Sequence, residues 1–116
     1  MIAAIDDLEV PVLACINGVA LGGGLEVALS CHWRTASSTS VVGLPEVHLG
    51  ILPGAGGTQR LPRLIGVEKA LEIMVSGRNV NAMEAQSLGI IDEVFPPVNS
   101  HDEMMDLAEK FLNSEK

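Results

Sequence analysis

Two segments of this chain decide its fold and its chemistry. The first reads NGVALGGGLE, residues 17–26, and the second reads VGLPEVHLGILPGAGGTQR, residues 42–60. A triple glycine between a strand and a helix brings bare backbone N–H groups to the helix N-terminus, where they can bind an oxygen that becomes negative. Glu26 and Glu46 could divide acid and base work between them if both converge on that point. The pattern indicates an enzyme site.

The length and composition of the chain limit its possible folds and functions. The 116 residues suit one compact domain, and a net charge of −8 argues against a nucleic-acid or anionic membrane surface. No apolar run approaches the roughly 20 residues that span a bilayer, so no membrane segment is expected. Cys15 and Cys31 are expected to be buried thiols of a reducing compartment, and their spacing fits no zinc pattern.

Short apolar runs alternate with helical patterns, which predicts an α/β fold. Residues 10–16 are predicted to form a buried strand covered on both faces, and residues 34–42 a polar loop and strand. Predicted helices cover 25–32, 67–75, the segment that begins at Asn81 and ends at Gly89, and the segment after Ser100. The helix at 67–75 is expected to pack through Ala70, Leu71, Met74 and Val75, and the last helix through Met104, Leu107, Ala108 and Phe111.

Local signals mark the ends of the later elements. Asn81 with Glu84, and Ser100 with Glu103, have the spacing of capping boxes. Gly89 is expected to end the helix that Asn81 begins, and a strand is predicted over residues 90–95 before Pro96-Pro97.

Each candidate residue also has a structural interpretation. Glu26 would compensate the helix dipole in the first turn even without a catalytic role. His32 is expected to be a satisfied core histidine, whereas His48 stays open between the two roles. Arg60 and Arg63 are expected at a helix surface. The loop at 54–57 resembles a phosphate loop but lacks its Lys-Ser/Thr.

The combination suits chemistry at an acyl thioester. When a base or acid acts at the α or β carbon, negative charge moves onto the thioester oxygen, and each preorganised N–H donor is worth roughly 3–4 kcal/mol. Gly23 suits such a donor because a residue without Cβ allows close backbone approach. Glu46 follows Pro45, which fixes the turn and could direct a second carboxylate into the same cleft.

These residues resemble the crotonase family, the enoyl-CoA hydratase/isomerase superfamily. The similarity runs from Pro11 to Pro96 and includes ING at 16–18, ALGGGLE at 20–26, GLPE at 43–46, LGILPGAGGTQRL at 49–61 and SGR at 76–78. LPEV at 44–47 and LPRL at 61–64 look most like the hydratase part of multifunctional fatty-acid oxidation enzymes. The resemblance implies a crotonase-like spiral of ββα units.

The resemblance also implies roles for particular residues. Glu26 and Glu46 would hold the attacking water, Glu26 helping to take a proton from it and Glu46 delivering one to the α carbon. Gly23 N–H would be one oxyanion donor, and the Gly54 backbone would lie against water and substrate. The substrate would be lined by Gly22, Gly23, Leu44, Pro45 and Pro53. No metal and no cofactor is expected, because coenzyme A is part of the substrate.

The family domain extends further on its N-terminal side, where it supplies more strands and the other oxyanion donor. Residues 1–116 are therefore expected to be a partial crotonase domain, with its core match at 11–96 and the start of a C-terminal helical region at 100–116. The complete domain is commonly a trimer or part of a larger multifunctional chain. The resemblance implies an intracellular location, in mitochondria, peroxisomes or a bacterial cytoplasm, without choosing among them.

Three functions follow as alternatives. The first is enoyl-CoA hydratase, the reversible addition of water to trans-2-enoyl-CoA in fatty-acid β-oxidation. The second is Δ3–Δ2 enoyl-CoA isomerase, which needs only one carboxylate to move a proton. The third is a catalytically incomplete remnant that folds by docking onto partner chains through the exposed edge of its first strand.

Overall fold

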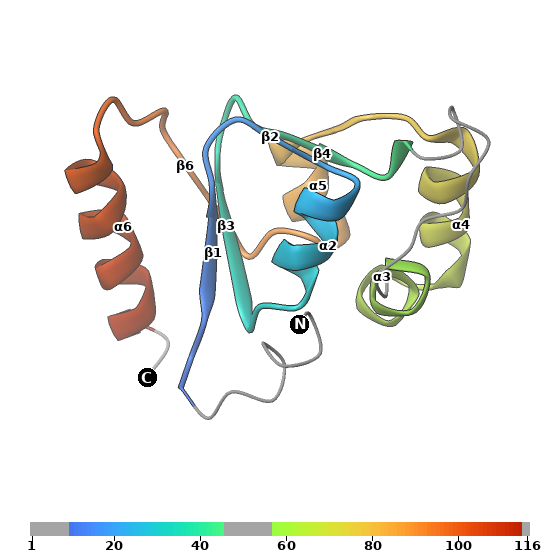
Figure 1. The fold of residues 1–116 in the computed structure, drawn as a ribbon, viewed down its shortest axis with the longest axis horizontal. Helices are drawn as coiled ribbons and strands as arrows, with labels where there is room; N and C mark the ends of the chain where they lie inside the picture. The colour runs from blue at the N-terminus through green and yellow to red at the C-terminus, as the bar shows by residue number, and fades with distance from the viewer. Residues whose placement is uncertain (1–9, 46–56, 115–116) are drawn as a thin grey trace.

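The computed structural model describes residues 10–45 and 57–114 and has the expected α/β character. Figure 1 shows the arrangement of its helices and strands. The strands are β1 (Leu13–Ile16), β2 (Val19–Leu21), β3 (Trp33–Ser37), β4 (Val41–Gly43), β5 (Val80–Asn81) and β6 (Glu93–Phe95). The helices are α2 (Gly23–Leu29), α3 (Gly57–Ile65), α4 (Val67–Ser76), α5 (Ala82–Leu88) and α6 (His101–Ser114).

The strands of the described residues form two three-stranded sheets, ordered β1-β3-β6 and β2-β4-β5. The consecutive pair β1 and β2 lies beside the consecutive pair β3 and β4. Both pairings are parallel, with Leu13 opposite Trp33 and Val19 opposite Val41. The chain thus runs through both sheets as β1 and β2, continues through α2, and then runs through both sheets again as β3 and β4. This repeat is the arrangement expected of a spiral of ββα units.

A pair of serines links the connection between β1 and β2 to the connection between β3 and β4. Ser40 Oγ donates to the carbonyl of Ile16 (3.1 Å) and accepts from the Gly18 N–H (3.0 Å). Ser37 Oγ lies 2.6 Å from Ser40 Oγ, and both serines are almost wholly buried. Because both serine hydroxyls are hydrogen-bonded, these bonds offset the cost of removing the hydroxyls from water.

The core lies between the two sheets and helices α2 to α5. Leu25 and Leu29 of α2 meet Leu61 of α3 and Ile73 of α4 there, all less than a tenth exposed. Helix α6 packs on the other side of the β1-β3-β6 sheet, through the buried Phe111. That sheet therefore separates α6 from α2, as Figure 1 shows.

The predicted helix ends are largely confirmed. The Asn81 side chain accepts the Glu84 N–H (2.8 Å), and Ser100 Oγ accepts the Glu103 N–H (3.2 Å). Gly89 ends α5 with a φ of 97°, in the left-handed region. The reciprocal half of the first capping box is absent, because the Glu84 carboxylate binds Arg78 instead.

Several predictions of burial and extent are wrong. The strand at 10–16 shortens to β1, whose first three residues are only half-buried, because β1 is the edge of its sheet. The helix predicted over 25–32 runs instead over Gly23–Leu29. Helix α4 buries Ala70 and Ile73, whereas Leu71 and Val75 are 50% and 70% exposed. The predicted polar loop and strand at 34–42 is two strands with mostly buried side chains.

Candidate active site

The first turn of α2 carries the glycine-rich segment. The Glu26 N–H donates to the Gly22 carbonyl (3.0 Å), which is the first i→i−4 bond of the helix. The amides of residues 23–25 precede that bond, so the helix itself offers them no carbonyl. Gly23 and Gly24 are exposed, and the positive end of the helix dipole lies at their N–H groups. Gly23 thus lies where the sequence predicted an oxyanion donor.

The three glycines at positions 22–24 differ in why the structure needs glycine there. Gly22 adopts φ 55° and ψ −122°, a conformation that residues with a Cβ rarely take. Its N–H donates to the Gly43 carbonyl (2.9 Å), so it is already engaged. A Cβ added to Gly23 or Gly24 would meet no atom within 4 Å. Gly22 is therefore needed for the turn, while Gly23 and Gly24 leave room for a ligand to approach the backbone.

Glu26 is buried in this turn, with 3% of its surface exposed. Its helix neighbours Leu25 and Ala28 belong to the hydrophobic core. A carboxylate that only compensated the dipole could do so from an exposed position, without the desolvation cost of burial. The burial of Glu26 therefore favours the catalytic interpretation over the structural one.

The ends of β2 and β4 bring a second segment to the same place. Leu21 is opposite Gly43 in the parallel pair, and Gly22, the residue after Leu21, donates its N–H to the Gly43 carbonyl. Leu44 is fully buried and Pro45 half-buried at this edge. Leu44 and Pro45 therefore follow β4 at the edge where β2 leads into α2.

Three predicted site residues, Glu46, Pro53 and Gly54, lie outside the described residues, as does His48. Their roles stay predictions. The structure thus brings together Glu26, Gly22, Gly23, Leu44 and Pro45, which come from two separate motifs of the sequence.

Arg34 is a positioning residue that the sequence analysis missed. It is 5% exposed and donates from Nη1 to the carbonyls of Cys31 (2.9 Å) and Ala28 (3.4 Å), and from Nε to that of Ile90 (2.7 Å). A cation among the last carbonyls of α2 complements the negative end of the helix. Burial lowers the pKa of the guanidinium, while the nearby Asp92 carboxylate opposes that shift. Arg34 thereby fixes the far end of the helix that carries Glu26.

The remaining candidates lie elsewhere. His32 follows the C-terminal end of α2, and its Nδ1 accepts the Val12 N–H (2.9 Å). It is satisfied as predicted, but it is exposed rather than in the core. Arg63 is exposed on α3 as predicted, whereas Arg60 is half-buried. Both cysteines are thiols and are half-buried.

No described helix has the length and apolar character to cross a membrane. No group of three or more His, Cys, Asp or Glu side chains lies close enough to hold a metal ion in the described part of the chain.

Comparison with known proteins identifies the family. The family model described as enoyl-CoA hydratase/isomerase matches residues 1–116. The chain belongs to the enoyl-CoA hydratase/isomerase family. It is 54% identical over 95 residues to fatty acid oxidation complex subunit alpha of Shewanella loihica, covering 80% of this chain and 14% of that protein. It is 60% identical over 94 residues to the peroxisomal bifunctional enzyme of Danio rerio, covering 81% of this chain and 13% of that protein.

Solved structures of the family confirm the predicted crotonase-like fold. An enoyl-CoA hydratase from Bacillus anthracis has a TM-score of 0.86 at 46% identity, covering 94% of this chain and 42% of that one. An enoyl-CoA hydratase from Thermoplasma volcanium has a TM-score of 0.83 at 40% identity, covering 95% and 44%. The chain thus spans less than half of these hydratases, and the curated relatives are larger multifunctional chains. The predicted similarity to the hydratase part of such chains is confirmed.

Proposed function

We propose that this chain carries the water-activating part of an enoyl-CoA hydratase, which adds water reversibly to trans-2-enoyl-CoA to give 3-hydroxyacyl-CoA in β-oxidation. The observation that carries the proposal is the burial of Glu26 in the first turn of α2, beside the outward-facing amide of Gly23. A base and an oxyanion donor at one helix end are what hydration of an enoyl thioester needs. The names of the family's relatives point to the same chemistry.

Each residue has a defined task in this proposal. The Glu26 carboxylate takes a proton from water as the water adds to the β carbon. The Gly23 N–H stabilises the negative charge that moves onto the thioester oxygen. Glu46 protonates the α carbon by the role that its motif implies. Coenzyme A belongs to the substrate, and we propose no further cofactor. The trimer expected from the resemblance stays a prediction.

The proposal is tested by a hydration assay with crotonyl-CoA, in which the loss of the enoyl-thioester absorbance measures the rate. We expect Glu26→Gln to lower the hydration rate at least a hundredfold, because general-base contributions are typically 10²–10⁴. The matched control is Glu68→Gln, which changes the first-turn carboxylate of α4, an exposed residue. This control should hydrate at the unsubstituted rate.

Two outcomes would contradict hydration. One is an unsubstituted chain without turnover above its Glu26→Gln variant. The other is conversion of a 3-enoyl-CoA to the 2-enoyl isomer that survives Glu26→Gln, with no product heavier by one water. The second outcome would make isomerisation the better account, because isomerisation needs only one carboxylate.

A further inference from the structure

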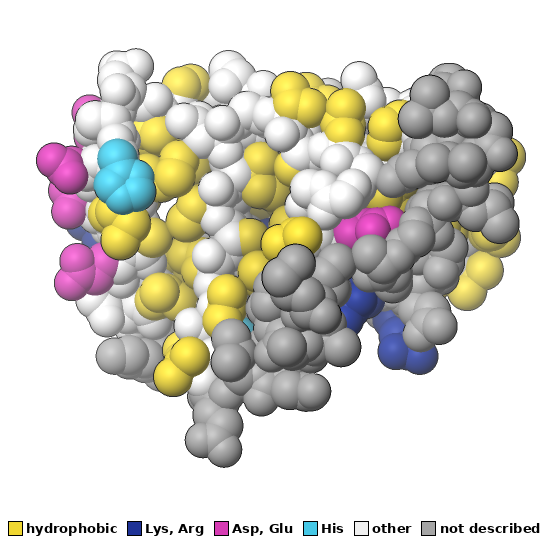
Figure 2. Space-filling view, viewed as in Figure 1, with side chains coloured by type: hydrophobic (Ala, Val, Ile, Leu, Met, Phe, Trp, Pro, Cys, Tyr) yellow, Lys and Arg dark blue, Asp and Glu magenta, His cyan; other side chains and the backbone are white. Residues whose placement is uncertain are grey.

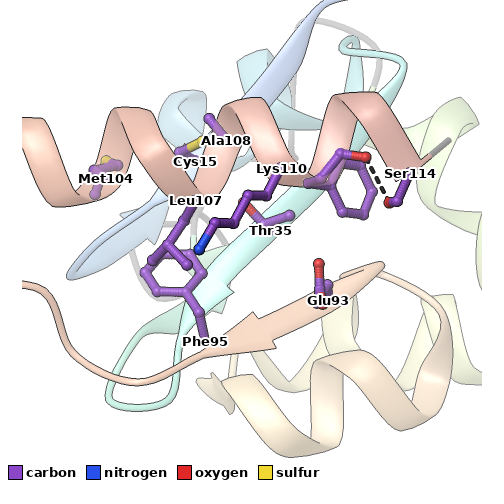
Figure 3. A pocket seen from close by; sticks show the side chains of 10 residues that line it. Cys15, Thr35, Glu93, Phe95, Met104, Leu107, Ala108, Lys110 and Ser114 are labelled. Carbon is purple, nitrogen blue, oxygen red and sulfur yellow. Dashed lines mark hydrogen bonds between the residues drawn. The ribbon is translucent and has the colours of Figure 1, made fainter. Parts of the chain in front are cut away.

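A second cavity lies away from the α2 site, between α6 and the β1-β3-β6 sheet. Its volume is about 260 Å³, and Figure 3 shows the residues around it. Since α2 packs on the opposite side of this sheet, the cavity and Glu26 lie on different sides of the same three strands. Apolar side chains also gather where α6 meets the strands, as Figure 2 shows.

The floor of the cavity is formed by one row of side chains that runs across the three strands. Cys15 is opposite Thr35 in the β1–β3 pair, and Thr35 is opposite Glu93 in the β3–β6 pair. Directly paired residues point to the same face of a sheet, and all three line the cavity. The alternate positions Ala14, Ala36 and Val94 belong to the core on the other face. The strand register therefore places a thiol, a hydroxyl and a carboxylate side by side beneath α6.

The roof is the apolar face of α6, formed by Met104, Leu107, Ala108 and Phe111. Phe111 also packs edge-on against Trp33, with ring centroids 6.4 Å apart, which fixes the helix on the sheet. The side chain of Lys110 reaches across the cavity in Figure 3. Lys110 and Glu93 are exposed charges of opposite sign at its rim, so neither sign of ligand charge is favoured.

Thr35 is a buried polar residue in the lining of the cavity. It is 4% exposed, yet its hydroxyl has no hydrogen bond to another residue in the described ranges. Because Thr35 lines the cavity, its hydroxyl can form a hydrogen bond with a bound group that donates to it or accepts from it. A ligand that carries such a group would be oriented by Thr35 with its apolar body against α6.

The size of the cavity limits the ligand. A dry apolar cavity of about 150 Å³ binds benzene, and drug-sized sites begin near roughly 300 Å³. The observed 260 Å³ lies between these values. It suits a single ring or a short aliphatic chain and excludes a whole acyl-CoA.

We propose that this cavity binds a small molecule with an apolar body and one hydroxyl group, held by the Thr35 hydroxyl. The site is independent of the proposed hydratase chemistry, because it uses none of the residues at the α2 N-terminus.

Phenol is the probe, and toluene is its matched analogue without the hydroxyl. In a titration followed by methionine-methyl NMR, phenol should shift Met104, which lines the cavity, and leave the exposed Met83 on α5 unmoved. Thr35→Val keeps the side-chain shape and removes the hydroxyl. It should weaken phenol roughly three- to tenfold, the usual range for one neutral hydrogen bond, and leave toluene unchanged.

Two substitutions on α6 separate filling of the cavity from a general effect on the helix. Ala108→Phe fills the space and should abolish the Met104 shift with both probes. Met105→Phe adds the same ring at a position that is 53% exposed and should change neither titration. In a Cys31→Ser background, phenol should also slow the reaction of Cys15 with a maleimide.

The proposal is overturned if phenol leaves Met104 unmoved in the unsubstituted chain. It is also overturned if Thr35→Val binds phenol as tightly as the unsubstituted chain does. Since valine and threonine are both favoured in strands, Thr35→Val is expected to fold, and this second arm does not depend on the folding of Ala108→Phe.

Discussion

At the scale of single residues, Gly43 shows how the site is built on close backbone contact. A Cβ at Gly43 would lie 3.1 Å from the Arg78 carbonyl and 3.3 Å from Leu21 Cδ2. The carbonyl belongs to the backbone and cannot move away as a side chain could. Gly43 also holds Gly22 through its own carbonyl, so the fit of β4 against residue 78 positions the turn before α2.

We predict that Gly43→Ala destabilises the protein by about 1–3 kcal/mol, the usual range for overpacking a tight interior. Urea unfolding followed by circular dichroism measures this change. Gly24→Ala is the matched control, because its new methyl would meet nothing within 4 Å. It should stabilise α2 by about 0.5–1 kcal/mol. Equal effects of the two substitutions would show that contact at Gly43 is not limiting.

The sequence indicated some residues and could not indicate others. Glu26 and Gly23 were predicted because a glycine triplet before a carboxylate is a local pattern. Arg34 was missed because its role depends on carbonyls at positions 28, 31 and 90, which only the fold brings together. Gly43 was quoted within a motif, but its tight contact with residue 78 is likewise visible only in three dimensions.

At the scale of elements, Arg78 joins α4 to α5. Its guanidinium binds Glu72 through Nε (2.7 Å) and Nη2 (2.8 Å), and Glu84 through Nη1 (3.0 Å) and Nη2 (2.8 Å). These hydrogen bonds lower the pKa of both carboxyl groups and raise that of Arg78. The three side chains are 34–42% exposed, so solvent screens the pairs and their contribution to stability is modest.

The lowered carboxyl pKa values give this cluster a defined pH dependence. Its contribution should be fully present above the ordinary glutamate pKa of about 4.3 and be lost as the pH falls through the lower folded values. We predict that Arg78→Gln unfolds at a lower temperature than the unsubstituted protein at pH 7, and that the gap closes at acid pH. Thermal unfolding from pH 7 to pH 2.5 measures the gap. A gap that stayed constant over this range would contradict the role of the ion pairs.

Element ends were more predictable than element faces. Asn81 and Gly89 mark the ends of α5 through local chemistry that needs no partner. The buried face of α4 was predicted only in part: Ala70 is buried and Met74 packs against the core, but the apolar residues cover a wider arc of the helix than the core contacts. Ala70 and Ile73 face the core, while Leu71 and Val75 stay exposed.

At the scale of the whole molecule, α6 is the element most separable from the rest. It lies on the opposite side of the β1-β3-β6 sheet from the other helices, and Phe111 is its only buried side chain among the described residues. Elements with few buried contacts open at a lower free energy than the core. α6 should therefore open before α2 or α4.

We predict that Phe111→Ala releases α6 and costs about 3–5 kcal/mol in the stability of that helix. Trp33 is the sole tryptophan and packs against Phe111, so its emission should shift to longer wavelength. Amide hydrogen exchange should accelerate in α6 while Ile73 in α4 keeps its protection. Met105→Ala on the exposed face of α6 is the matched control and should leave the exchange of α6 unchanged. Acceleration in α4 equal to that in α6 would show that α6 does not open separately.

The strand order has a consequence for how this chain reaches its native state. The pairings closest in sequence, between β1 and β3, already join residues as distant as Leu13 and Trp33, and β3 pairs with β6 across a much longer interval. Nearly all sheet contacts thus have high contact order, and no described pair can form as a local hairpin. Because loop entropy is lost before such contacts are gained, strand pairing should follow collapse of the apolar core rather than precede it.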